Sequence, residues 1–145
     1  MKTSIITNKD IDRKYYLLDA EGQILGRLAV RAELLLSGKR KVGYTPNVDN
    51  GDFVVVVNAS KVAVTGDKLE DKTYTSFSGY PGGLKTKNLG TLMRTRPTEV
   101  IRHAVKGMIP KNKLGSRMIT RLKVYAGPEH PHTAQRPVVL AKEGK

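Results

Sequence analysis

Two histidines separated by one proline, His130 and His132, are the first residues whose spacing could do chemistry, because two imidazoles at this distance can chelate a metal ion. Glu129 is the acidic residue beside them, the chain has no cysteine, and the surrounding sequence is strongly basic. Positive surroundings oppose a dication and favour contacts with phosphates. We therefore expect no metal here and predict that both histidines contact nucleic acid, with turn capping as the alternative.

A glycine-containing stretch, Gly22 to Arg27, lies between a predicted strand and a predicted helix, where a phosphate-binding loop would lie. The nucleotide-binding pattern needs four residues between its glycines, followed by Lys and then Ser or Thr. Here three residues separate Gly22 from Gly26, and Arg27-Leu28 follow. The stretch predicts a turn and a helix start rather than a nucleotide site, although it is the one feature that favours a nucleotide-using enzyme.

The carboxylates that could act in catalysis are scattered over predicted loops and turns: Asp49, Asp52, Asp67, Glu70 and Asp71. No Ser or Thr with an adjacent base and no carboxylate pair in a predicted pocket accompanies them. His103 lies beside an apolar stripe, which indicates a packing role. We expect no enzyme, no cofactor and no small-molecule substrate.

The charge of the chain indicates its partner. Its 145 residues carry 26 basic and 13 acidic side chains, a net charge of +13. Residues 79–145 hold 14 of the basic and 3 of the acidic residues, so a polyanion should bind this half. Only 6% of residues are aromatic, which argues against a single-strand binder built on stacking.

No apolar run approaches the roughly 20 residues of a membrane span, and without an export signal we expect a cytoplasmic protein.

The predicted RNA contacts are cations at irregular spacing, together with exposed rings and the two histidines. Irregular placement suits a curved RNA surface better than the face of a helix that reads a major groove. Tyr44 and Tyr80 either stack on a base or pack in the core. The predicted contacts are Lys39, Arg40, Lys41, Tyr44, Tyr80, Lys85, Lys87, Arg94, Arg96, Lys106, Lys111, Lys113, Arg117, Arg121, Lys123, His130, His132 and Arg136.

Hydrophobic periodicity predicts the elements that position these residues. Apolar residues at helical spacing predict helices over 26–37, 97–108 and 114–120. Strands are expected at 15–20, 53–57, 61–65, 73–78 and 122–125, and a long loop from residue 80. The continuous apolar run of Phe53 to Val57 is typical of a strand buried on both faces of a parallel sheet.

The alternation of these elements predicts an α/β fold. We expect one three-layer α/β/α domain around a small, mostly parallel sheet. Residues 15–126 would form this core, residues 1–14 an N-terminal arm, and residues 127–145 a basic C-terminal tail packed on RNA.

Two stretches carry a family resemblance: residues 103–112 and residues 122–132, the latter continued by Ala134, Gln135 and Pro137. Both resemble signature regions of the universal L-thirteen family of large-subunit ribosomal proteins, in its bacterial form. Further matches follow the same order upstream, at residues 19–20, 25–29, 38–39, 44–46, 51–52 and 57–59. The resemblance extends from about residue 14 to residue 140.

The resemblance implies a non-catalytic constituent of the bacterial large (50S) ribosomal subunit, with a compact α/β core. Its partners would be large-subunit ribosomal RNA and neighbouring ribosomal proteins, and it would join early in subunit assembly. A general RNA or nucleic-acid chaperone is the alternative, which would bind random duplex DNA as well as ribosomal RNA.

Overall fold

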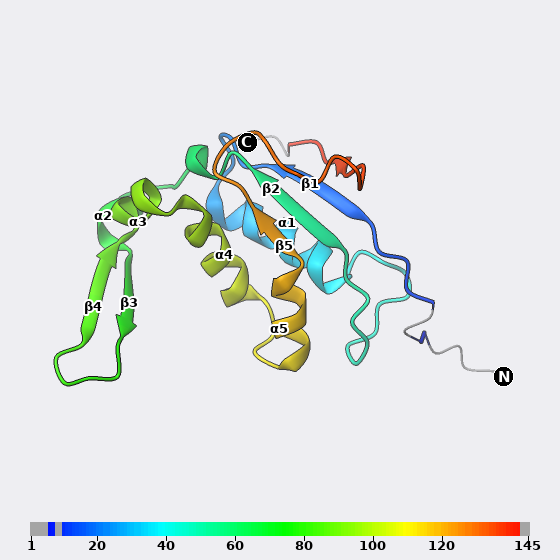
Figure 1. Ribbon diagram of the computed structural model, residues 1–145, viewed down its shortest axis with the longest axis horizontal. Helices are drawn as coiled ribbons and strands as arrows, with labels where there is room; N and C mark the ends of the chain where they lie inside the picture. The colour runs from blue at the N-terminus through cyan, green and yellow to red at the C-terminus, as the bar shows by residue number, and fades with distance from the viewer. Residues whose placement is uncertain (1–5, 8–9, 143–145) are drawn as a thin grey trace.

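The computed structural model describes residues 6–7 and 10–142 of the chain. Figure 1 shows a body built around one sheet, with a hairpin that projects from one end. In chain order the elements are β1 (Tyr15–Asp19), α1 (Leu25–Ser37), β2 (Phe53–Val57), the 3₁₀ turn η1 (Ala59–Lys61), α2 (Lys68–Asp71), β3 (Thr73–Phe77), β4 (Leu84–Asn88), α3 (Leu89–Thr95), α4 (Pro97–Met108), α5 (Lys113–Thr120), β5 (Leu122–Val124) and β6 (Val138–Val139).

The central sheet has the order β5-β2-β1-β6, and every pair in it is parallel. Tyr15 is paired with Phe53 at one end of β1 and β2, and Asp19 with Val57 at the other. The last four residues of β2 are buried, because strands and packed layers surround them on every side. The prediction of a buried strand in a parallel sheet is confirmed.

The strand order decides which face each connection covers. From β1 to β2 and from β2 to β5 the chain steps in the same direction across the sheet. Right-handed crossovers then place both connections on one face. Helices α1, α4 and α5 pack against one another there, and the completely buried Leu28, Val54 and Ile101 belong to the core that they share.

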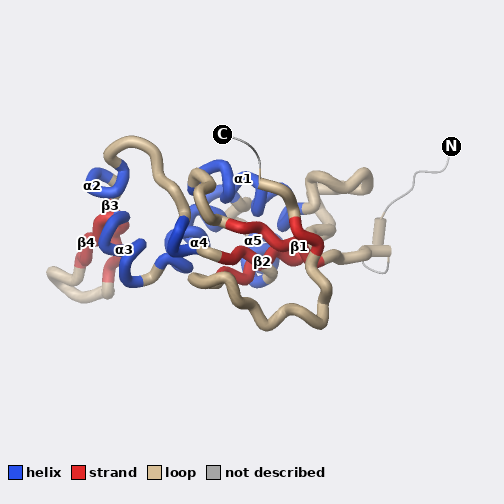
Figure 2. The backbone as a smooth tube through the Cα atoms, turned by 90° about the horizontal axis from the view of Figure 1, so that it is seen from above, coloured by secondary structure: helices blue, strands red, loops and turns tan. Residues whose placement is uncertain are grey.

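The C-terminal segment covers the opposite face, because the step from β5 back to β6 runs the other way. The rings of Tyr15 and Phe53 stack at 4.4 Å, and the His132 ring lies 6.3 Å from Tyr15. Figure 2 shows α1 on one side of the strands and loop on the other. The predicted α/β class and mostly parallel sheet are confirmed. The third layer is extended chain instead of helix, since residues 125–137 contain a glycine and three prolines.

Residues 61–95 differ most from the prediction. The strand expected at 61–65 is reduced to an isolated parallel bridge between Ile24 and Ala63. The strand at 73–78 exists, but it forms a separate antiparallel hairpin with β4. The expected long loop contains β4 and α3. Every residue of β4 is exposed. Because neither face of the strand is buried, its sequence does not need the alternation of apolar and polar residues that would predict a strand.

Candidate nucleic-acid interface

The loop between α1 and β2 folds back onto the end of α1. Gly38 ends the helix at a φ of 76°, and its N–H donates to the Leu35 carbonyl at 3.2 Å. A Cβ on Gly38 would lie 2.7 Å from the Asn50 carbonyl oxygen, so the close approach requires glycine. The Asp52 N–H donates to the same Leu35 carbonyl at 3.0 Å. Both ends of the loop are therefore held at one point.

Two predicted RNA contacts in this loop are engaged with carboxylates of the chain itself. Lys39 Nζ lies 2.8 Å from Glu33 Oε1, and this hydrogen bond raises the pKa of Lys39. Lys41 Nζ lies 2.7 Å from Asp52 Oδ1 and donates to the Asp12 carbonyl at 2.6 Å. Glu33 and Asp52 are both buried, and a buried carboxylate needs such a partner. The two lysines therefore stabilise the loop.

The neighbouring predicted contacts in the loop are on the surface. Arg40 is exposed and lies between the two paired lysines. Tyr44 is 37% exposed, so its ring is neither a core residue nor fully open to a base. This loop therefore offers one free cation, Arg40, and one partly accessible ring.

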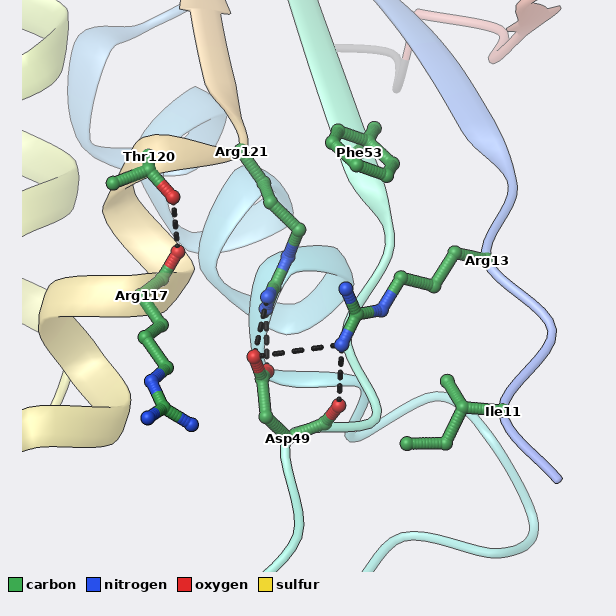
Figure 3. Close-up of a pocket in the computed structure, with 7 residues that line it drawn as sticks. All are labelled: Ile11, Arg13, Asp49, Phe53, Arg117, Thr120 and Arg121. Carbon is green, nitrogen blue, oxygen red and sulfur yellow. Dashed lines mark hydrogen bonds and ion pairs between the residues drawn. The ribbon is translucent and has the colours of Figure 1, made fainter. Parts of the chain in front are cut away.

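Arg121 is the predicted contact that the structure places inside the protein. It is 5% exposed, and its two terminal nitrogens hold the Asp49 carboxylate at 2.5 and 2.6 Å (Figure 3). Nη2 also donates to the Leu36 carbonyl at 3.0 Å. Arg13 donates to the Asp49 carbonyl at 3.1 Å from the other side. Arg121 joins α5, α1 and the α1–β2 loop, so its prediction as an RNA contact is corrected.

Arg117 lies one helical turn before Arg121 and has the opposite environment. Its side chain is exposed and makes no ion pair among the described residues. Figure 3 shows both arginines at a pocket of about 650 Å³, with Arg121 bonded to Asp49 and the Arg117 guanidinium free of it. Spacing alone could not separate these two residues, because both lie in or next to α5 and have the same chemistry.

The junction of α4 and α5 brings three predicted contacts together. Lys106, Lys111 and Lys113 line one groove of about 790 Å³, and all three are exposed. The Asn112 side chain caps α5 by accepting from the Gly115 N–H at 2.8 Å. A Cβ on Gly115 would overlap the Pro110 carbonyl oxygen, so the turn between the helices is tight. This geometry holds the three ammonium groups around one concave surface.

The start of α4 carries a second group of cations. Arg94 lies in the last turn of α3, Arg96 precedes Pro97 at the first position of α4, and Arg102 follows within that helix. All three arginines are exposed. Arg102, which was absent from the predicted contacts, lines a small groove with Lys123 and residues of β5. Arg102 is recognised as a surface cation by its exposure in the structure, and no sequence motif marks it.

The hairpin carries Tyr80, Lys85 and Lys87. Tyr80 is 76% exposed, so the core-packing alternative for this ring is excluded. Lys85 and Lys87 lie on β4 opposite Ser76 and Tyr74, and both are exposed. The hairpin that carries these two cations and this ring projects from the body (Figure 1).

The C-terminal segment holds His132 by contacts within the chain. His132 Nε2 lies 2.8 Å from the Tyr125 hydroxyl, and the His132 N–H donates to His130 Nδ1 at 3.2 Å. Burial lowers the pKa of His132, and so does the positive potential of His130 and Lys123. These contacts fix the segment on the sheet. Lys123 and Arg136 are exposed there.

The cations of the described residues thus divide into two groups. Every ion pair between described residues uses a carboxylate from residues 19–52. Lys14, Arg27, Lys68 and Lys72 are exposed and outside these pairs as well. We reserve the name unpaired cations for those of the α1–β2 loop and of residues 79–142: Arg40, Lys85, Lys87, Arg94, Arg96, Arg102, Lys106, Lys111, Lys113, Arg117, Lys123 and Arg136. Apart from Arg40, they lie on the hairpin, on α3–α5 and in the residues that follow.

Metal binding and membrane insertion are the two remaining questions for the described part of the chain. No cluster of three or more acidic or histidine side chains there could hold a metal ion. No helix among the described residues is long and apolar enough to span a membrane.

Comparison with known proteins finds similarity to one protein family over nearly the whole chain. The family model described as "Ribosomal protein L13" matches residues 13–131. A protein of Caldanaerobacter subterraneus named large ribosomal subunit protein uL13 is 58% identical over 140 residues, which cover 97% of this chain and 98% of that protein. The protein of the same name from Thermus thermophilus is also 58% identical, over 97% of this chain and 99% of its own length. The one from Pelobacter propionicus is 55% identical over the same shares.

Proposed function

The chain belongs to the ribosomal protein L13 family, and from that premise we propose that it is a structural constituent of the large (50S) ribosomal subunit. In this role it binds large-subunit ribosomal RNA and neighbouring ribosomal proteins and acts early in subunit assembly. The family is one of ribosomal proteins, so the chain is not an enzyme and its place is the ribosome in the cytoplasm.

The unpaired cations are the observation that carries the RNA-binding proposal. An exposed cation without an acidic partner is free to neutralise a phosphate, and phosphate contacts fix a protein on a nucleic acid. The groove at the α4–α5 junction gathers Lys106, Lys111 and Lys113 on one concave surface, which suits a folded RNA backbone. If about 6–10 phosphates are contacted, affinity falls about 10³- to 10⁵-fold between 50 and 200 mM salt.

The proposed surface differs from the sequence prediction at four residues. Lys39 and Lys41 hold buried carboxylates, Arg121 is buried, and His132 is bonded to Tyr125. We assign these side chains to the stability of the fold. The other predicted contacts, with Arg102 added, form the proposed RNA surface. Most of them lie on the core of residues 15–126, and residues 127–142 contribute His130 and Arg136.

The proposal is tested by sucrose-gradient fractionation of a lysate at ordinary and high salt, with the protein followed by mass spectrometry. We expect it to migrate with the large subunit and to remain there at moderate salt. A protein found only in the soluble top fractions would overturn the proposal.

A competition experiment separates this function from that of a general nucleic-acid chaperone. We expect large-subunit ribosomal RNA to retain the protein against an excess of random duplex DNA. Equal competition by the DNA would favour the chaperone instead.

A further inference from the structure

The far end of the β3–β4 hairpin exposes three large apolar side chains, which we call the hairpin tip: Phe77, Tyr80 and Leu84. They are 67%, 76% and 64% exposed. Phe77 and Leu84 are directly paired across the two strands, so they share one face of the hairpin. Adjacent apolar side chains open to water in this way mark an interaction surface.

The turn that carries Tyr80 is closed by two backbone hydrogen bonds. The Gly83 N–H donates to the Tyr80 carbonyl at 2.9 Å, and the Ser78 N–H donates to the Gly83 carbonyl at 3.2 Å. Pro81 and Gly82, which has a φ of 71°, occupy the two central positions, as a type II turn requires. A surface that is ordered before binding loses little conformational entropy when a partner covers it.

The other end of the hairpin is anchored to the body. The ring of Tyr74 meets the ring of His103 on α4 edge to face at 4.9 Å, and the Leu89 N–H donates to the Lys72 carbonyl at 2.8 Å. An isolated two-stranded hairpin is marginally stable in water. These contacts hold its base while the tip projects from the molecule (Figure 1).

The charge of the hairpin favours RNA over protein as the partner of the tip. Residues 73–88 contain no acidic side chain and two lysines, Lys85 and Lys87. The cross-strand pairs place both lysines on the face opposite Phe77 and Leu84. A hairpin with aromatic side chains at its tip and cations on its other face suits structured RNA, where unpaired bases stack on rings and phosphates meet lysines.

We propose that Phe77 and Tyr80 of the hairpin tip stack on unpaired bases of the large-subunit RNA, while Lys85 and Lys87 contact phosphates on the other face of the hairpin. This inference rests on the proposed function and adds to it a contact that does not depend on charge. The tip therefore contributes affinity that salt does not screen, unlike the contribution of the unpaired cations.

The test measures binding to protein-free large-subunit ribosomal RNA over a range of salt concentrations. The variants are F77A/Y80A at the tip, K85A/K87A on β4, and V42A as a control at another fully exposed apolar residue. We expect F77A/Y80A to weaken binding about 10- to 100-fold with an unchanged salt slope. We expect K85A/K87A to reduce the slope of log affinity against log salt by about 1–2, and V42A to match the wild type.

Two outcomes would overturn the inference. F77A/Y80A could bind the RNA as tightly as V42A does, which would exclude base stacking by the tip. It could also bind the RNA normally yet fail to enter large subunits, which would assign the tip to a neighbouring protein. If the wild-type protein bound neither the RNA nor the large subunit, the proposed function itself would be wrong. That result differs from both outcomes above, in which the wild type still binds.

Discussion

The α1–β2 loop and the α4–α5 junction both carry clustered cations, yet they use them differently. In the loop, Lys39 and Lys41 hold the buried carboxylates of Glu33 and Asp52. At the junction, the lysines line an open groove and make no ion pair among the described residues. Cations in one region therefore stabilise the fold, and those in the other remain available to a polyanion.

Arg117 and Arg121 repeat this difference within one helical turn. The two arginines are four residues apart, but Arg121 is buried against Asp49 while Arg117 is exposed. What decides the role of each is whether a carboxylate from a distant part of the chain reaches it. Asp49 is 72 residues away from Arg121 in sequence, so the fold alone brings them together.

Breaking the Arg121–Asp49 pair should have the largest effect. Arg121→Ala leaves the Asp49 carboxylate buried with only the more distant Arg13, whose nitrogen lies 3.7 Å away. We expect a loss of about 3–5 kcal/mol in the free energy of unfolding, measured by urea denaturation. The matched variant Arg117→Ala should change it by less than about 0.5 kcal/mol. Similar losses in both variants would contradict the division into paired and unpaired cations.

Lys41→Ala should have a smaller effect of the same kind. The change leaves Asp52 Oδ1 with the Lys14 N–H at 3.0 Å as its remaining partner. We expect a loss of about 1–3 kcal/mol in the free energy of unfolding. Arg40→Ala, next in the chain and exposed, serves as the control and should leave stability within about 0.5 kcal/mol. If Lys41→Ala were neutral while Arg40→Ala destabilised the protein, the roles assigned in this loop would be reversed.

The smallest expected effect concerns His132. Burial, together with His130 and Lys123, lowers the pKa of this ring below its ordinary value of 6.5. The unfolded chain then binds more protons than the folded protein just below pH 6.5, so stability rises with pH through that window and falls on acidification. His132→Gln should remove this component, so thermal unfolding midpoints of the variant should drop less than those of the wild type between pH 7.5 and 5.5. Identical pH profiles would contradict a lowered pKa of His132.

Local patterns were sufficient to predict the sheet and the long helices. The apolar run of β2 and the helical spacing of α1 and α4 each reflect burial against neighbours, which hydrophobic periodicity records directly. The hairpin strand β4 and helix α3 were not predicted. Strand β4 buries neither face, so its sequence lacks the hydrophobic periodicity that would indicate a strand. The covering of the second sheet face by extended chain depends on the position of β6, a two-residue strand too short to predict.

The sequence predicts the charge of the candidate site but not which residues belong to it. Lysine and arginine content places a basic surface in the C-terminal half, and most predicted contacts there are exposed. Lys39, Lys41 and Arg121 were predicted as RNA contacts because the sequence does not show that Glu33, Asp52 and Asp49 pair with them in the folded chain. Phe77 and Leu84 could not be separated from core residues by sequence, since alternation along a strand does not tell which face is covered.

The salt dependence of RNA binding tests the division between paired and unpaired cations most directly. The measurement compares the wild type with two sets of lysine-to-glutamine changes, K106Q/K111Q/K113Q at the α4–α5 junction and K39Q/K41Q in the α1–β2 loop. We predict that the first set reduces the slope of log affinity against log salt by about 2–3 and leaves stability nearly unchanged. The second set should lower stability and leave the slope of the folded protein as it is. Equal loss of slope in both sets would contradict the account.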